Sequence, residues 1–68
     1  MSLDEGMVRM IADAYDETVS EALGRGHSAD DAHREGITAS AMFLASMAGI
    51  DDGDARRQVE GLGLSVPA

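Results

Sequence analysis

The chain has 68 residues, with 13 acidic residues, five arginines, no lysine and no cysteine, and its formal net charge at pH 7 is −8. This length limits the chain to a single small domain, expected over residues 1–68, and the lack of cysteine excludes disulfides and thiolate metal sites. The negative charge disfavours binding to nucleic acid and to anionic membranes, and it favours a basic protein as a partner.

The first predicted helix covers about residues 3–23. Ser2 followed three residues later by Glu5 has the pattern of a capping box, so Ser2 is the expected cap. From Met7 onward the apolar residues share one side of the helix, and the charged residues occupy the other side. Gly24 and Gly26 follow the last apolar position and are expected to end the helix.

The second predicted helix covers about residues 29–48. Ser28 is its expected N-cap, and Gly49 followed by the apolar Ile50 is the pattern of a glycine stop. Only about four residues would separate the two helices, so they are expected to fold back on each other as an antiparallel hairpin.

The second helix carries apolar residues on more than one side. Two stripes, 37/41/44/48 and 43/47, lie on either side of the small residues Gly36 and Ser40, and Met42 points away from both stripes. One neighbouring helix cannot cover all of these positions, so we expect a second copy of the chain to cover the rest. The residues expected at that interface are Gly36, Ser40, Met42, Phe43 and Met47.

Residues 36–50 form a run of fifteen residues without a charge. A membrane-spanning helix needs about 20 apolar residues, and this run also contains glycine, serine and threonine. The acidic N-terminal segment does not have the basic and then apolar pattern of a signal peptide. We therefore expect a buried helix, no membrane contact and a cytoplasmic location.

A third, shorter helix is predicted over about residues 52–60, followed by a tail over 61–68 in which Leu64 and Val66 dock and the end frays. The acids at 51, 52 and 54 fit a capped helix start; a calcium loop would need an oxygen ligand where Gly53 stands and a glutamate where Leu62 stands. The predicted fold is all-α: a hairpin with a short third helix, completed as a bundle by homo-oligomerisation.

Two residues are candidates for a metal site. Asp30 and His33 lie one helical turn apart, a spacing at which two side chains can share a metal, and Glu17 or Glu21 of the first helix could join them. The alternative is that His33 faces the first helix near Thr18 and is satisfied by one hydrogen bond, with Asp30 placed at the positive helix end. We favour this alternative and expect no cofactor.

The stretch from Leu44 to Asp51, followed by Asp54 to Val59, resembles the helix-turn-helix of bacterial repressors. The matching features are a Leu-Ala pair, a glycine four residues after that alanine, an apolar residue, a capping residue and a following helix. The resemblance implies a recognition helix that places Arg56, Arg57 and Gln58 against bases. The acids at 51, 52 and 54 crowd the end that would enter the groove, so DNA binding is the second hypothesis.

The sequence favours a non-enzymatic function. It has no cysteine nucleophile, Ser28 beside His27 is better used as a helix cap, and the carboxylates of the first helix lie on its solvated side. We therefore expect a small helical module that self-associates or serves as an accessory subunit. The alternatives are the helix-turn-helix DNA-binding protein and a helical oligomer with a metal ion at its interface.

Overall fold

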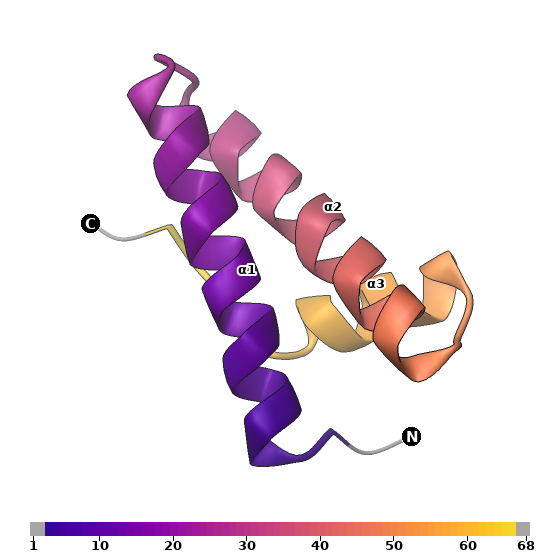
Figure 1. The fold of residues 1–68 in the computed structure, drawn as a ribbon. Coiled ribbons are helices and arrows are strands. Elements are labelled where there is room, and N and C mark those ends of the chain that lie inside the picture. Colours follow the sequence, from indigo (N-terminus) through magenta and orange to yellow (C-terminus); the bar gives the residue numbers. More distant parts are fainter. Residues whose placement is uncertain (1–2, 67–68) are drawn as a thin grey trace.

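The computed structural model describes residues 3–66, and it confirms the all-α class. Three helices are present among these residues, and the described part of the chain contains no strand: α1 is Glu5–Gly24, α2 is Ala29–Ala48 and α3 is Asp52–Glu60. Helices α1 and α2 lie side by side as an antiparallel pair (Figure 1). Within residues 3–66, no helix has the length and apolar character that crossing a bilayer requires.

Helix α1 begins later than the sequence suggested. Its N-cap is Asp4, whose carboxylate accepts a hydrogen bond from the backbone N–H of Met7 at 2.7 Å. This corrects the expectation of a Ser2 cap; Ser2 itself lies outside the described residues. Asp4 fits the role because its acceptor oxygen and its negative charge both favour the positive end of the helix.

The ends of the other helices follow the sequence closely. Ser28 accepts from the N–H of Asp31 at 3.1 Å, and Asp51 accepts from the N–H of Asp54 at 2.8 Å. The hydrogen bond from that N–H is the main reason why the pKa of Asp51 is lowered. Gly49 ends α2 with φ of 69°, a left-handed conformation that glycine adopts without a steric cost.

Small residues on α2 allow α1 to approach it closely. Gly36 is buried against the rings and methyls of Tyr15 and Val19, and an added Cβ atom at Gly36 would lie 2.6 Å from Cδ2 of Tyr15. The buried Ser40 hydroxyl donates to the Gly36 carbonyl at 2.8 Å and lies 3.4 Å from the Ile11 carbonyl of α1. The backbones of the two helices therefore meet at these small residues.

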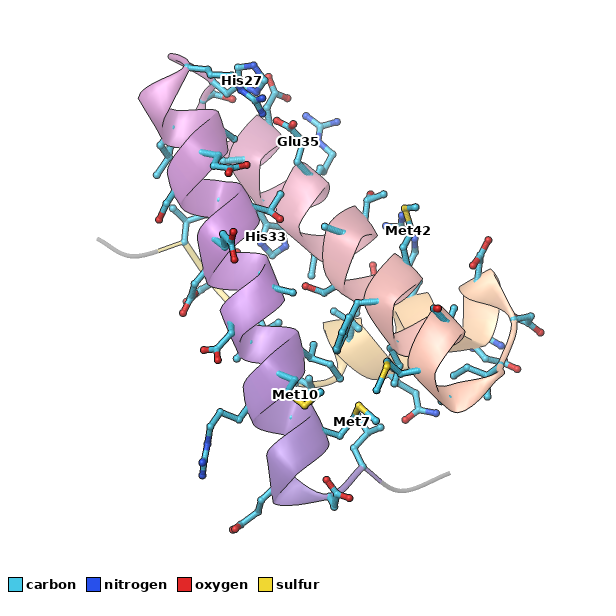
Figure 2. The ribbon with its side chains drawn as sticks, in the orientation of Figure 1. Met7, Met10, His27, His33, Glu35 and Met42 are labelled. Atoms are coloured by element: carbon cyan, nitrogen blue, oxygen red, sulfur yellow. The ribbon has the colours of Figure 1, made fainter. Side chains whose placement is uncertain are left out.

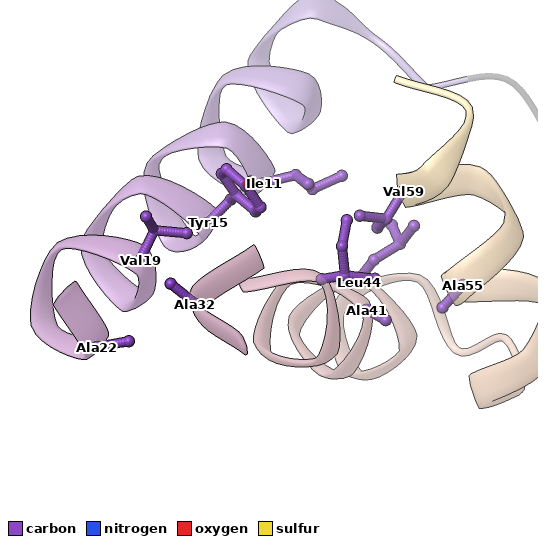
Figure 3. Close-up of a cluster of buried hydrophobic side chains, with 10 residues drawn as sticks. Ile11, Tyr15, Val19, Ala22, Ala32, Ala41, Leu44, Ala55 and Val59 are labelled. Atoms are coloured by element: carbon purple, nitrogen blue, oxygen red, sulfur yellow. The ribbon is translucent and has the colours of Figure 1, made fainter. Parts of the chain in front are cut away.

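Helix α3 and the segment after it cover one side of the pair. Figure 1 shows α3 behind α2, and the C-terminal segment passing behind α1. Ala55 and Val59 of α3 are fully buried, and Leu64 and Val66 of the tail pack against the same core. Figure 3 shows that Leu44 of α2 lies near Val59 within this core. The core thus lies between the helix pair and α3.

Candidate interaction surface

The opposite side of the α1–α2 pair is not covered by any other segment among residues 3–66 (Figure 1). Residues three and four positions apart lie on the same side of a helix, so this spacing identifies one row of residues on each helix that faces this side. A shallow hollow on this side is lined by Thr18 of α1 and by Arg34, Glu35, Thr38, Ala39 and Met42 of α2. We give the name open face to the apolar residues and Thr18 on and around this side: Met7, Met10, Ala14 and Thr18 of α1 and Ala39, Met42, Phe43 and Met47 of α2. Polar residues share these rows, Glu35 and Ser46 with Ala39 and Met42, and Glu21 with Thr18.

The open face is mainly apolar, and two charged side chains, Arg34 and Glu35, line the same hollow as Met42. Its methionines are the most exposed part: the exposed fractions are 42% for Met10, 63% for Met42 and 54% for Met47. Phe43 is half-buried and packs against the core beneath it. Thr18 is the only one of the eight residues whose side chain has a hydrogen-bond donor. Figure 2 shows Met7 and Met10 near one another on α1, with Met42 farther along α2.

Charged residues lie at the end of this surface nearest the α1–α2 loop. Glu35 accepts from Arg25 at 3.5 Å and lies 2.5 Å from Nδ1 of His27, so one carboxylate ties the loop to α2 (Figure 2). Arg34 pairs with Asp31 on the same helix at 3.0 Å. These ion pairs are exposed and contribute little to stability.

The structure divides the five residues that were expected at an interface into an accessible group and a buried group. Met42 and Met47 are exposed and Phe43 is half-buried, so these three are accessible. Gly36 and Ser40 are instead buried against α1 of the same chain, and their use there corrects the expectation that a second copy would pack against them. Helix α2 is also less apolar than expected, because Arg34, Thr38 and Ser46 are exposed on its outer side.

Met10 was missed by the sequence analysis. It lies three residues after Met7 and four before Ala14, so the spacing places it at the edge of the apolar side of α1. That spacing could have identified it.

A partly buried hydrogen bond joins the two helices. The Tyr15 hydroxyl lies 2.7 Å from Nδ1 of His33, and the two rings meet edge to face at a centroid distance of 5.6 Å. The expectation that His33 faces α1 is therefore confirmed, although its partner is Tyr15 and not Thr18. Burial raises the pKa of Tyr15, and the negative charge of Asp16 raises it further.

This raised pKa predicts a loss of stability in alkali. Folded Tyr15 keeps its proton at a pH where the unfolded chain loses it, so the free energy of unfolding is fully retained below about pH 10 and falls above it. Tyr15 is the only tyrosine, and the chain has neither lysine nor cysteine, so no other side chain titrates in this range. Urea unfolding between pH 8 and about 11.5 should show the decline in the natural chain and a much flatter profile in Tyr15→Phe. Equal slopes in the two proteins would contradict this assignment.

The candidate metal ligands do not form a cluster. Asp30 is exposed in the first turn of α2, and His33 already uses Nδ1 in its contact with Tyr15. Among residues 3–66, no three histidine, cysteine, aspartate or glutamate side chains come together in a way that could hold a metal ion.

The candidate DNA-contacting residues lie on α3, and other residues of the chain already contact two of them. Arg56 donates to the hydroxyl of Thr38 on α2 at 3.0 Å, and Arg57 pairs with Asp54 one turn earlier. Gln58 is half-buried. Both guanidinium groups therefore already have partners within the chain, and they lie beside three aspartates of the same segment.

No family model, curated protein or solved structure that was compared with this chain matches it.

Proposed function

We propose that this protein is a small non-enzymatic helical module that self-associates through its open face. The observation that carries the proposal is the one-sided cover of the α1–α2 pair: α3 and the tail pack on one side, and the other side presents Met10, Met42 and Met47 to solvent. A surface of this kind marks a site of association, because single small domains otherwise keep contiguous apolar patches limited.

A second copy is the occupant best supported by charge. Each chain carries a net charge of −8, so two copies repel each other unless they meet at a surface without charge. The eight residues of the open face supply contact area that is not ionisable, and Arg34 and Glu35, which line its hollow, carry opposite charges. Pairing would also enlarge a small core, because a domain of about 60 residues buries only about 60% of its unfolded surface. The pair of helices from each copy would then form a four-helix bundle.

The oligomeric state tests this proposal. Sedimentation of the purified chain should show a dimer or larger species at high micromolar concentration, and Met42→Glu should weaken association by tenfold or more, that is, about 1.4 kcal/mol. Ser20→Glu is a matched control, because Ser20 is exposed on the other side of α1 and the substitution adds the same charge. A chain that remains monomeric at high micromolar concentration contradicts the proposal, and so do equal effects of the two substitutions.

The salt dependence distinguishes a second copy from a basic partner. Salt screens the repulsion between two acidic chains, so self-association should tighten when sodium chloride is raised from 0.05 to about 1 M. An acidic surface that binds a basic protein shows the opposite trend, because salt screens an attraction. Association that weakens steadily with salt would therefore contradict the apolar interface.

A further inference from the structure

We infer that oxidation of the open-face methionines controls the association of the chain. This inference depends on the proposed self-association, and it adds a modification site to it. Met10, Met42 and Met47 have the exposures given above, so small oxidants can reach these side chains when the chain is alone. With no cysteine in the chain, methionine supplies its only sulfur atoms.

The chemistry needs a peroxide as oxidant. A lone pair of the thioether sulfur attacks one peroxide oxygen, the O–O bond breaks, and the sulfur gains a single oxygen atom. With hydrogen peroxide the other oxygen leaves as water, so the thioether is oxidised to a sulfoxide while the peroxide is reduced. Sulfoxide reductases can reverse this change.

The composition of the open face makes this change costly for association. A sulfoxide is a polar acceptor, and it needs a hydrogen-bond donor when it is buried. Thr18 supplies the only side-chain donor among the eight residues, a second copy would bring the same eight, and the other donors that line the hollow, Arg34 and Thr38, lie beside Met42. Sulfoxides at Met10 and Met47 would therefore lose their hydration without gaining a side-chain partner from the open face. Oxidised chains are expected to associate at least about tenfold more weakly.

Association and oxidation should also oppose each other. An assembled pair shields the methionines of its interface, so the peroxide reacts mainly with the separated chain. The sulfoxides that form then keep this chain from associating. Raising the protein concentration should slow oxidation of Met42 and Met47, which peptide mass spectrometry can follow residue by residue. Oxidation rates that do not depend on protein concentration would contradict this linkage.

The decisive experiment compares two proteins before and after treatment with hydrogen peroxide. One is the natural chain; the other carries Met7→Leu, Met10→Leu, Met42→Leu and Met47→Leu, because leucine has a similar volume and cannot form a sulfoxide. Sedimentation gives the dissociation constant, and circular dichroism reports the helical content. The expected result is a loss of association of at least about tenfold in the natural chain alone, with its helices intact.

The other possible outcomes would overturn this inference. A natural chain that is dimeric before treatment and equally dimeric after it overturns the oxidation inference and leaves the proposed function standing. Equal losses in the two proteins, or loss of the helices, overturn it as well, because the effect would then come from elsewhere. A natural chain that is monomeric before treatment overturns the proposed function and, with it, this inference.

Discussion

Gly36→Val is expected to prevent stable folding, and Gly36→Ala to lower the free energy of unfolding by about 1–3 kcal/mol. The cause is steric: an added Cβ atom at this position would lie 2.6 Å from Cδ2 of Tyr15 and 2.8 Å from Cγ2 of Val19. Both neighbours are buried, so neither can move without disturbing the core. Valine adds two further methyl groups at the same place. The loss outweighs the gain of about 1 kcal/mol that alanine brings to a helix interior.

Thermal unfolding at one fixed protein concentration measures this effect. In a domain of this size, Gly36→Ala should lower Tm by about 5–20 °C, since each kcal/mol corresponds to about 4–8 °C. Gly24→Ala is the matched control, because Gly24 is also helical and no atom would lie within 4 Å of its added Cβ. The control should leave Tm unchanged or raise it slightly. A Gly36→Ala chain as stable as the control would mean that the helices do not pack as closely as described.

Leu44→Ala is expected to cost about 2–5 kcal/mol of unfolding free energy, the usual range when a fully buried leucine is truncated. Leu44 is completely buried, and its cluster includes Ile11 of α1 and Val59 of α3, so one side chain serves two packing contacts of α2 (Figure 3). Domains of this length have a total stability of about 3–10 kcal/mol, at 0.05–0.15 kcal/mol per residue. The substitution therefore removes a large part of the total.

Urea unfolding followed by circular dichroism gives the measurement. Leu23→Ala makes the same chemical change at an exposed position and should cost much less, while Leu44→Met keeps most of the volume and should cost less than about 1.5 kcal/mol. If the two leucine-to-alanine variants unfolded at the same urea concentration, Leu44 would not be the centre of the core.

The helix ends were the features most accessible to sequence reasoning. Each capping residue acts on backbone groups within three or four positions of itself, so its role follows from local chemistry. These residues are Ser28, Gly49 and Asp51. The start of α1 was harder, because Ser2 and Asp4 can both accept a backbone hydrogen bond. Which of the two does so depends on where the chain leaves the extended conformation, and that is decided by packing around Leu3 and Met7.

The surface was only partly accessible, for a geometric reason. A helical wheel gives the direction of a side chain relative to its own helix, and it does not say which neighbour stands there. Gly36 and Ser40 were correctly expected to allow close approach, but the neighbour is α1 and not a second copy. The exposure of Met10 depends on how α1 is rotated about its own axis relative to its neighbours. The partner of His33 depends on whether the Tyr15 side chain extends far enough across the hairpin.

The placement of α3 has a consequence for how the chain comes apart. This helix has nine residues, too few to persist in water alone, and its packing contacts are mainly with α2. Brief detachment of α3 should therefore precede global denaturation, while the longer hairpin stays closed. During such an event one side of Leu44 would be exposed to solvent. Amide protons of α3 would then exchange with solvent sooner than those at the centre of α2. Helix α3, which is the least stable element on its own, thus shields the core side of α2 from solvent.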